Sequence, residues 1–393
     1  MGARTATGRT GMVAMLAALL AAQTAPAQTP APAPPPDAAP LRAVPLGSAV
    51  RLPQLRDDER YRATFLREFD SLTPENEMKM QSLQPRRGRF DFAATDELVR
   101  FARRNGKSLR GHTLVWGQAL PLWLVDRGAL DKIGLRLPPI VLPRLPNPLG
   151  KLVGEATTLL TGWRRDELMA VMKDHIRRVM RRYRGDIVEW DVVNEPMAED
   201  GGLAATVWRR FIGPDYVEQA LRTARAADPR AKLFVNDFAV EGPGRKLDGL
   251  VRLARDLVAR GVPLDGIGLQ SHTHILGSHD EATLTSTMRR FSDLGLEVQI
   301  TEMDVGTSLI GVSRAERLQR QALAYGAAAR ACNAVTACTR FTTWGFTDAV
   351  SWLGAGESGL LFDRHYRPKP AYAAVRDAFA PRQAAARQPP RGR

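Results

Sequence analysis

Residues 186–196 read DIVEWDVVNEP, a run of apolar and β-branched residues that closes with Asn194, Glu195 and Pro196. A short apolar run bounded by turn residues predicts a buried strand. In the segment before it, residues 166–183, apolar side chains recur at steps of three and four residues, which predicts an amphipathic helix. A helix that leads into a buried strand is the repeating unit of an α/β fold.

The same alternation of strands and helices continues over most of the chain. Besides Ile187–Val193, the runs predicted as strands are Arg42–Val50, Phe69–Thr73, Ser108–Val115, Lys232–Asn236, Gly266–Gln270, Glu297–Thr301 and Arg340–Trp344. Eight strands with helical segments between them predict an α/β protein of the (β/α)8 TIM barrel type. A doubly wound open sheet is the alternative, but the glycine-rich phosphate turn that usually follows its first strand is absent from the sequence.

The N-terminus has the pattern of an export signal. Arg4 and Arg9 precede a short apolar run, which is followed by small residues up to Ala27, and this pattern predicts a cleaved signal peptide. The run is too short to span a bilayer as a helix, so we expect no stable membrane insertion of the mature protein. The predicted segments are a signal peptide at 1–27, a Pro/Ala-rich linker at 28–40, a catalytic barrel at 41–380 and a basic disordered tail at 381–393.

Export would carry the protein to the periplasm or the medium. Both compartments are oxidising, so we predict that Cys332 and Cys338, the only two cysteines, form a disulfide. Two free buried thiols are the alternative. So few cysteines exclude a disulfide-rich scaffold and a cysteine-based metal site.

One connection is longer than a barrel requires. Between Asp126 and Gly162, after the third predicted strand, the sequence shows no clear period and contains five prolines. Connections of this length are usually functional or disordered. In a barrel this one would lie on the face where active sites are built, so we predict an insertion over 126–162 at that face.

The composition of the 393 residues, 44% hydrophobic and 25% charged, is that of a soluble globular protein. The formal net charge of +14 is typical of proteins with anionic partners. However, four arginines lie in the last thirteen residues, and no basic run is interleaved with aromatic residues. We therefore do not expect nucleic-acid binding.

A second stretch, LEVQITEMDV at residues 296–305, places Glu302 at the end of the seventh predicted strand. The fourth and seventh strand ends of a barrel face each other across its mouth, so Glu195 and Glu302 would meet there. Two carboxyl groups are what glycoside hydrolysis requires: one protonates the leaving oxygen, and the other attacks or activates water. Either glutamate alone could instead cap the helix that follows it.

The other predicted strand ends also carry polar and aromatic side chains. Amides, carboxylates and lysine hydrogen-bond sugar hydroxyls, and indoles stack on pyranose rings. The residues in question are Glu75, Asn76, Lys79, His112, Trp116, Asn236, Asp237, Gln270, His272, Trp344 and Trp352. Their convergence on one rim favours a carbohydrate site over separate core positions.

Six short motifs at the predicted strand ends resemble, in the same order along the chain, those of family 10 glycoside hydrolases, which are endo-β-1,4-xylanases. The matching motifs are TPENEMK (73–79), RGHTLVW (110–116), WDVVNEP (190–196), GIGLQSH (266–272), ITEMDV (300–305) and TTWGFTD (342–348). The resemblance covers roughly residues 41–380. It implies a retaining double displacement on internal xylan bonds, with no cofactor.

The resemblance also implies a role for each matching residue. Glu195 would be the general acid/base and Glu302 the nucleophile, while Asn194 would bind the 2-hydroxyl of the sugar. His272 would contact the nucleophile and be held by Asp304. The expected substrate-binding residues are Glu75, Asn76, Lys79, His112, Trp116, Gln270, Trp344 and Trp352.

Two positions depart from the family pattern. Gly117-Gln118-Ala119 replaces a more polar triplet near the glycone subsites, and Phe238-Ala239 replaces Tyr-Asn on the leaving-group side. We expect these changes to affect subsite affinity and to leave the catalytic carboxyls unaffected. The positive charge could attract xylan that bears glucuronic acid, and we expect a monomer.

Three other functions remain open at this point. His272 and His274 form a His-x-His pair that suits a metal, but only His112 could join them from another strand end, so we predict no metal. A barrel glycosidase for cellulose or mannan would share the two glutamates. A xylan-binding protein with weak or no activity is the third possibility.

Overall fold

The computed structural model describes residues 44–125, 162–354 and 356–380, all within the compact unit Leu41–Arg393. The predicted signal peptide, linker and tail lie outside the described residues, as does the predicted insertion apart from Gly162. These segments therefore stay predictions. None of the described helices is both long and apolar enough to cross a membrane.

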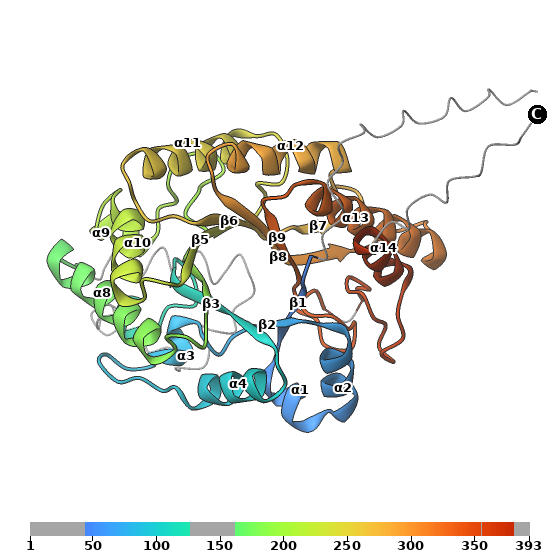
Figure 1. Cartoon of the computed structure of the whole chain (residues 1–393), viewed down its shortest axis with the longest axis horizontal. Coiled ribbons are helices and arrows are strands. Elements are labelled where there is room, and N and C mark those ends of the chain that lie inside the picture. Colours follow the sequence, from blue (N-terminus) through green and yellow to red (C-terminus); the bar gives the residue numbers. More distant parts are fainter. Residues whose placement is uncertain (1–43, 126–161, 355, 381–393) are drawn as a thin grey trace, which may run out of the picture. The chain divides into compact units, whose positions relative to one another are not determined.

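The described residues form one parallel sheet that closes into a barrel (Figure 1). Its strands are β1 (Leu46–Val50), β2 (Ser71–Pro74), β3 (Ser108–Trp116), β4 (Glu189–Asn194), β5 (Lys232–Asp237), β6 (Gly266–Leu269), β7 (His272–His274), β8 (Glu297–Gly306) and β9 (Cys338–Thr343). Strands β1 to β6 follow one another, β6 pairs with β8, and β9 pairs back with β1. This closure confirms the predicted (β/α)8 barrel.

Helices lie outside the barrel, as Figure 1 shows for α8, α10, α11, α12 and α13. The helices are α1 (Leu52–Asp57), α2 (Glu59–Glu68), α3 (Met80–Leu83), α4 (Ala93–Arg104), α5 (Leu122–Val125), α8 (Arg165–Arg182), α9 (Val207–Phe211), α10 (Tyr216–Ala227), α11 (Arg245–Ala259), α12 (Glu281–Ser292), α13 (Arg314–Ala334) and α14 (Pro370–Phe379).

Helix α8 illustrates why these segments are helical. Its buried residues are Leu168, Met172, His175, Ile176, Val179 and Met180, which is the stripe of three- and four-residue steps seen in the sequence. Asp166 and Glu167 lie in its first turn and Arg181 and Arg182 in its last, so both ends complement the helix dipole. The predicted range of 166–183 differs from the observed one by a single residue at each end.

The strand β7 is not among the predicted strands, and β8 is longer than predicted. It pairs with the second half of β8, with His272 opposite Asp304 and His274 opposite Gly306. Since β8 continues to Gly306, Glu302 lies within the strand, and the predicted strand end at Thr301 is wrong. Cys332 of α13 and Cys338 of β9 form a disulfide with a Cα–Cα distance of 5.2 Å.

Candidate active site

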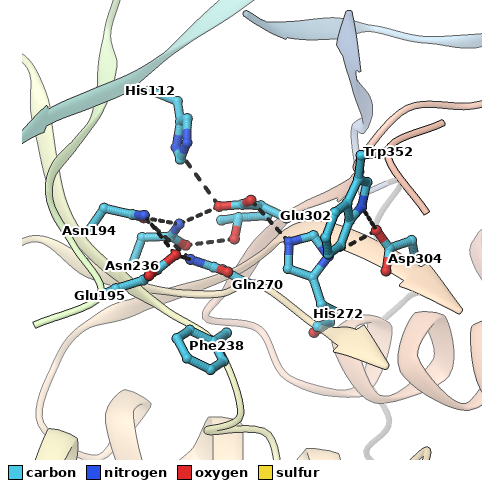
Figure 2. Close-up of polar contacts among 12 residues, drawn as sticks. His112, Asn194, Glu195, Asn236, Phe238, Gln270, His272, Glu302, Asp304 and Trp352 are labelled. Carbon is cyan, nitrogen blue, oxygen red and sulfur yellow. Dashed lines mark hydrogen bonds and ion pairs between the residues drawn. The ribbon is translucent and has the colours of Figure 1, made fainter. Parts of the chain in front are cut away.

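Glu195 follows the last residue of β4 and Glu302 lies in β8, and a chain of two side-chain amides joins them (Figure 2). The Nδ2 of Asn236 donates to Glu302 Oε1 over 2.6 Å and to Asn194 Oδ1 over 2.7 Å. The Nδ2 of Asn194 donates in turn to Glu195 Oε1 over 3.3 Å. The two glutamates predicted from the sequence therefore belong to one polar cluster.

Glu302 is 4% exposed and is surrounded by groups that favour its ionised form. His272 Nε2 lies 3.3 Å from its Oε2, and His112 Nδ1 lies 3.8 Å from its Oε1. Burial acts to raise the pKa of Glu302, but the charge of His112 and the hydrogen bond from His272 prevail and lower it. A buried carboxylate that stays ionised can act as a nucleophile.

His272 is held between two carboxylates. Its Nδ1 lies 2.9 Å from Asp304 Oδ2, and Asp304 also accepts a 2.5 Å hydrogen bond from Trp352 Nε1. Burial acts to lower the pKa of His272, but the charge and hydrogen bond of Asp304, together with Glu302, raise it well above its usual value. The protonated ring then donates at both nitrogens, to Asp304 and to Glu302.

Glu195 lies in a different environment. Its Oε1 accepts from Asn194 and, over 3.3 Å, from Gln270 Nε2. Burial raises the pKa of Glu195, and the charge of Glu302 adds to the rise. One carboxyl with a raised pKa beside one with a lowered pKa is the asymmetry that separates an acid from a nucleophile.

The backbone at Glu195 is also unusual. Its φ of 54° lies in the left-handed region, as do the φ of 53° at Ala239 and of 61° at Ser271, which follow β5 and β6. Residues other than glycine adopt this conformation at a cost of about 1–3 kcal/mol, and such residues cluster at functional sites.

Aromatic rings line the space beside the carboxyls. The Trp344 ring is 5.1 Å from His112 and 6.1 Å from His272, and the Trp352 ring is 5.1 Å from His272. Trp352 is 49% exposed, whereas Trp344 is 7% exposed. The exposed indole of Trp352 therefore offers a face on which a sugar can stack, and the indole of Trp344 is buried.

The residues of the TPENEMK motif occupy two environments. Lys79 Nζ lies 5.3 Å from the Trp116 ring centre, 5.9 Å from that of Trp344 and 3.1 Å from Asn76 Oδ1, so these residues belong to the aromatic side of the site. Glu75 instead pairs with Arg51, whose Nη2 lies 2.7 Å from Glu75 Oε1. That salt bridge uses both carboxylate oxygens of Glu75, because the Arg51 Nε donates to the other over 2.7 Å.

The structure adds a contact at one of the positions that depart from the family pattern. Gln118 Nε2 donates to Glu195 Oε2 over 3.1 Å, so the altered triplet contacts one of the two candidate carboxyls. A left-handed turn at Ala119, with φ 49°, follows this residue. The sequence does not predict this contact, and the expectation that the departures leave the two carboxyls unaffected stays a prediction.

The sequence places Asn236 at a strand end but predicts no role for it. It is fully buried, and Thr301 Oγ1 donates to its Oδ1 over 2.7 Å, which orients its amide nitrogen toward Glu302. The register that pairs Asn194 with Asn236 places their side chains together. Two asparagines at the ends of neighbouring strands are the signal that could have revealed this bridge.

The two histidines of the possible metal pair face different partners. His274 Nε2 lies 3.0 Å from the backbone oxygen of Ser308, while His272 contacts Glu302 and Asp304. Among the described residues, no group of three or more His, Cys, Asp or Glu side chains is arranged to hold a metal ion.

A parallel barrel with an ionised and a protonatable glutamate in one buried polar cluster defines a glycoside hydrolase site. Residues 37–378 match the profile of glycosyl hydrolase family 10, and the chain belongs to that family.

Relatives with assigned functions are similar over most of their length. The chain is 35% identical to endo-1,4-beta-xylanase B of Thermotoga neapolitana over 328 residues, which cover 82% of this chain and 84% of that protein. It is 34% identical to an endo-1,4-beta-xylanase of Agaricus bisporus, over 80% of this chain and 84% of that protein.

Solved structures give the same result. Native xylanase 10B from Thermotoga maritima superposes with a TM-score of 0.73 at 34% identity, over 86% of this chain and 95% of that one. Xylanase 10B from Thermotoga petrophila RKU-1, solved with xylobiose, has a TM-score of 0.73 at 33% identity, over 86% and 94% of the two chains.

Proposed function

We propose that the protein is an endo-1,4-β-xylanase that cleaves internal β-1,4-xylosidic bonds with retention of anomeric configuration. Family membership supports this activity, and the opposite pKa shifts of Glu195 and Glu302 support the assignment of their roles. The observation that carries the mechanism is the amide chain from Glu302 through Asn236 and Asn194 to Glu195.

In the first step, a Glu302 oxygen attacks the anomeric carbon while the glycosidic bond breaks. The proton of Glu195 goes to the departing oxygen, and the enzyme retains a glycosyl ester at Glu302. His272 and Asn236 donate to the Glu302 carboxylate, so they orient it for attack. Asn194, whose Oδ1 accepts from Asn236, would bind the 2-hydroxyl of the sugar.

In the second step, the Glu195 carboxylate takes a proton from water, and the water oxygen attacks the anomeric carbon. The ester bond breaks, and Glu302 returns to its carboxylate form while Glu195 is again protonated. Two inversions at one carbon give net retention.

The substrate-binding part of the proposal rests on the aromatic side of the site. Trp116, Trp344, Trp352, Lys79 and Asn76 would hold the glycone xyloses, with His112 and Gln270 beside the reacting sugar. Arg51 binds both carboxylate oxygens of Glu75. Glu75 would therefore contribute to substrate binding indirectly, through the residues around it. Xylan bearing glucuronic acid is the proposed natural substrate, and the protein would act as a monomer after export.

Proton NMR during hydrolysis of xylohexaose tests this function. We predict that the products of cleavage at internal bonds appear first and that the new reducing ends are initially β-anomers. An initial α-anomer would contradict retention, and faster hydrolysis of a β-1,4-glucan or a mannan would contradict the substrate.

A further inference from the structure

A buried ion pair lies beside the Glu195 segment. Asp237, the last residue of β5, is fully buried, and its Oδ1 lies 3.1 Å from Nζ of Lys246, whose side chain is 4% exposed in the first turn of α11. Removing two charges from water costs several kcal/mol per ion, so a pair of this kind is not explained by stability alone. Its contacts indicate what else it does.

The last two residues of β5 hold both sides of the Glu195 turn. The backbone oxygen of Asn236 accepts from Glu195 N over 2.7 Å. The Oδ2 of Asp237 accepts from Met197 N over 3.0 Å, and Pro196 between them has no N–H to offer. Together these two bonds fix the segment in which Glu195 has its left-handed φ of 54°.

The other oxygen of Asp237 is equally engaged. Its Oδ1 accepts from Phe238 N over 2.9 Å as well as facing Lys246. With amide donors on both oxygens and Lys246 beside one of them, the surroundings of Asp237 favour a carboxylate, which accepts hydrogen bonds at both oxygens.

Lys246 favours the charged form of Asp237. Burial raises the pKa of Asp237 to about 7 with Lys246 in place, and without the charge of Lys246 this pKa would be higher still. Glu199 also lies 3.4 Å from Lys246 but is 76% exposed, so it is a weak partner, and the charge of Lys246 acts on Glu195 as well, where it favours the ionised form. Lys246 Nζ also lies 3.2 Å from the centre of the Phe238 ring, which is labelled near Glu195 in Figure 2.

We propose that Lys246 is a positioning residue for the acid/base: by pairing with Asp237 it fixes the carboxyl group that holds the Met197 and Phe238 amides, and thereby keeps Glu195 aimed at the glycosidic oxygen. The inference rests on the proposed function. It adds a residue whose hydrogen bonds and ion pairs in the described structure go to Asp237 and Glu199 and not to Glu195.

Two substrates distinguish this role from a merely structural one. Xylotetraose needs a proton on its leaving sugar, whereas 2,4-dinitrophenyl β-xylobioside releases a phenolate that needs none. For Lys246→Met, we predict that kcat/KM falls about 10- to 100-fold on xylotetraose and less than about 3-fold on the aryl substrate. The larger loss does not exceed what a general acid contributes to the rate. Lys246→Arg, which keeps the charge, should recover part of the loss.

Lys369→Met is the matched control. Lys369 forms the comparable pair with Asp348, each side chain being 3% exposed, and its hydrogen bonds go to Asp348 and the Ser358 backbone. This variant should change kcat/KM on both substrates by the same factor. An equal loss on both substrates in Lys246→Met, or no loss on either, would overturn the proposal.

An NMR measurement tests the role of Lys246 even if the protein lacks the proposed xylanase activity. In protein labelled with 15N-methionine, the Met197 amide signal should shift in Lys246→Met and stay in place in Lys369→Met. If the wild-type protein hydrolyses neither substrate, the proposed function fails, yet this shift still tests the link between Lys246 and Met197. An unmoved Met197 signal would contradict the link between Lys246 and Met197. If Lys246→Met does not fold, Lys246→Gln replaces it in both the kinetic and the NMR measurement.

Discussion

Asn236 donates a 2.6 Å hydrogen bond to Glu302, and the same nitrogen donates to Asn194 beside the second glutamate. The donor favours the ionised form of Glu302, which is the form that would attack in the proposed mechanism. The bond also couples the geometry of the nucleophile to that of the residue next to the acid/base.

Replacing Asn236 should therefore raise the pKa of the nucleophile. In Asn236→Ala, Glu302 loses a charge-assisted hydrogen bond, which is worth about 1.5–3 kcal/mol, or about 1–2 pH units. Because a higher pKa means that Glu302 is protonated at a higher pH, the acidic limb of the kcat/KM profile should move upward by about 1 unit. The limb is measured on an oligosaccharide between pH 3 and 8. An unchanged acidic limb would show that Asn236 has no such effect.

The alkaline limb should report Glu195, whose pKa is raised by burial and by Glu302. Activity is lost as the pH rises through this pKa, because the acid then has no proton to give. In Glu302→Gln the charge of Glu302 disappears, so the pKa of Glu195 should fall, which direct 13C titration of its carboxyl can follow. A rise in that pKa would contradict the coupling.

Gln118 offers a test of the departure from the family pattern. Its amide donates to Glu195 Oε2, so Gln118→Leu removes a group that favours the carboxylate. The pKa of Glu195 should rise, and the alkaline limb should move to higher pH by less than about 1 unit. Gln54→Leu, in helix α1, is the control and should leave the limb in place.

Azide should distinguish the two glutamates. In Glu195→Ala an activated aryl xyloside still forms the glycosyl ester, and azide can then attack without a general base, so activity should return with a β-glycosyl azide product. Glu302→Ala lacks the group that forms the ester, so any azide product should have the α configuration. The same anomer from both variants would contradict the assigned roles.

The barrel interior gives a prediction about stability. A Cβ at Gly111 would lie 2.1 Å from a ring carbon of Trp190, which is 1% exposed. Gly111→Ala should lower the free energy of unfolding by at least about 1–3 kcal/mol, the usual cost of overpacking. Gly244→Ala, where no atom lies within 4 Å of the added carbon, should be close to neutral. Urea denaturation of both variants measures the difference.

The sequence was most informative where a short-range pattern determines the structure. The helix at 166–183 followed from its apolar spacing, and the pairing of Glu195 with Glu302 followed from strand ends that meet in a barrel. Both depend on periodicity and order, which a sequence shows directly.

Other features depend on side-chain orientation across strands. The bridge at Asn236 requires the register of β4 against β5 and the hydrogen bond from Thr301. The extension of β8 requires β7, a strand of three residues that is too short to show a period. The contact from Gln118 to Glu195 depends on the turn at Ala119, whose positive φ its residue type does not favour.

In the proposed mechanism, Glu302 forms a covalent bond with the sugar. Incubation with 2,4-dinitrophenyl 2-deoxy-2-fluoro-β-xylobioside, followed by mass spectrometry of the intact protein and its peptides, detects this bond. The account predicts one added fluoroxylobiosyl group per chain, attached to Glu302. A fully inactivated protein with the label on any other residue, or turnover with no trapped ester, would contradict it.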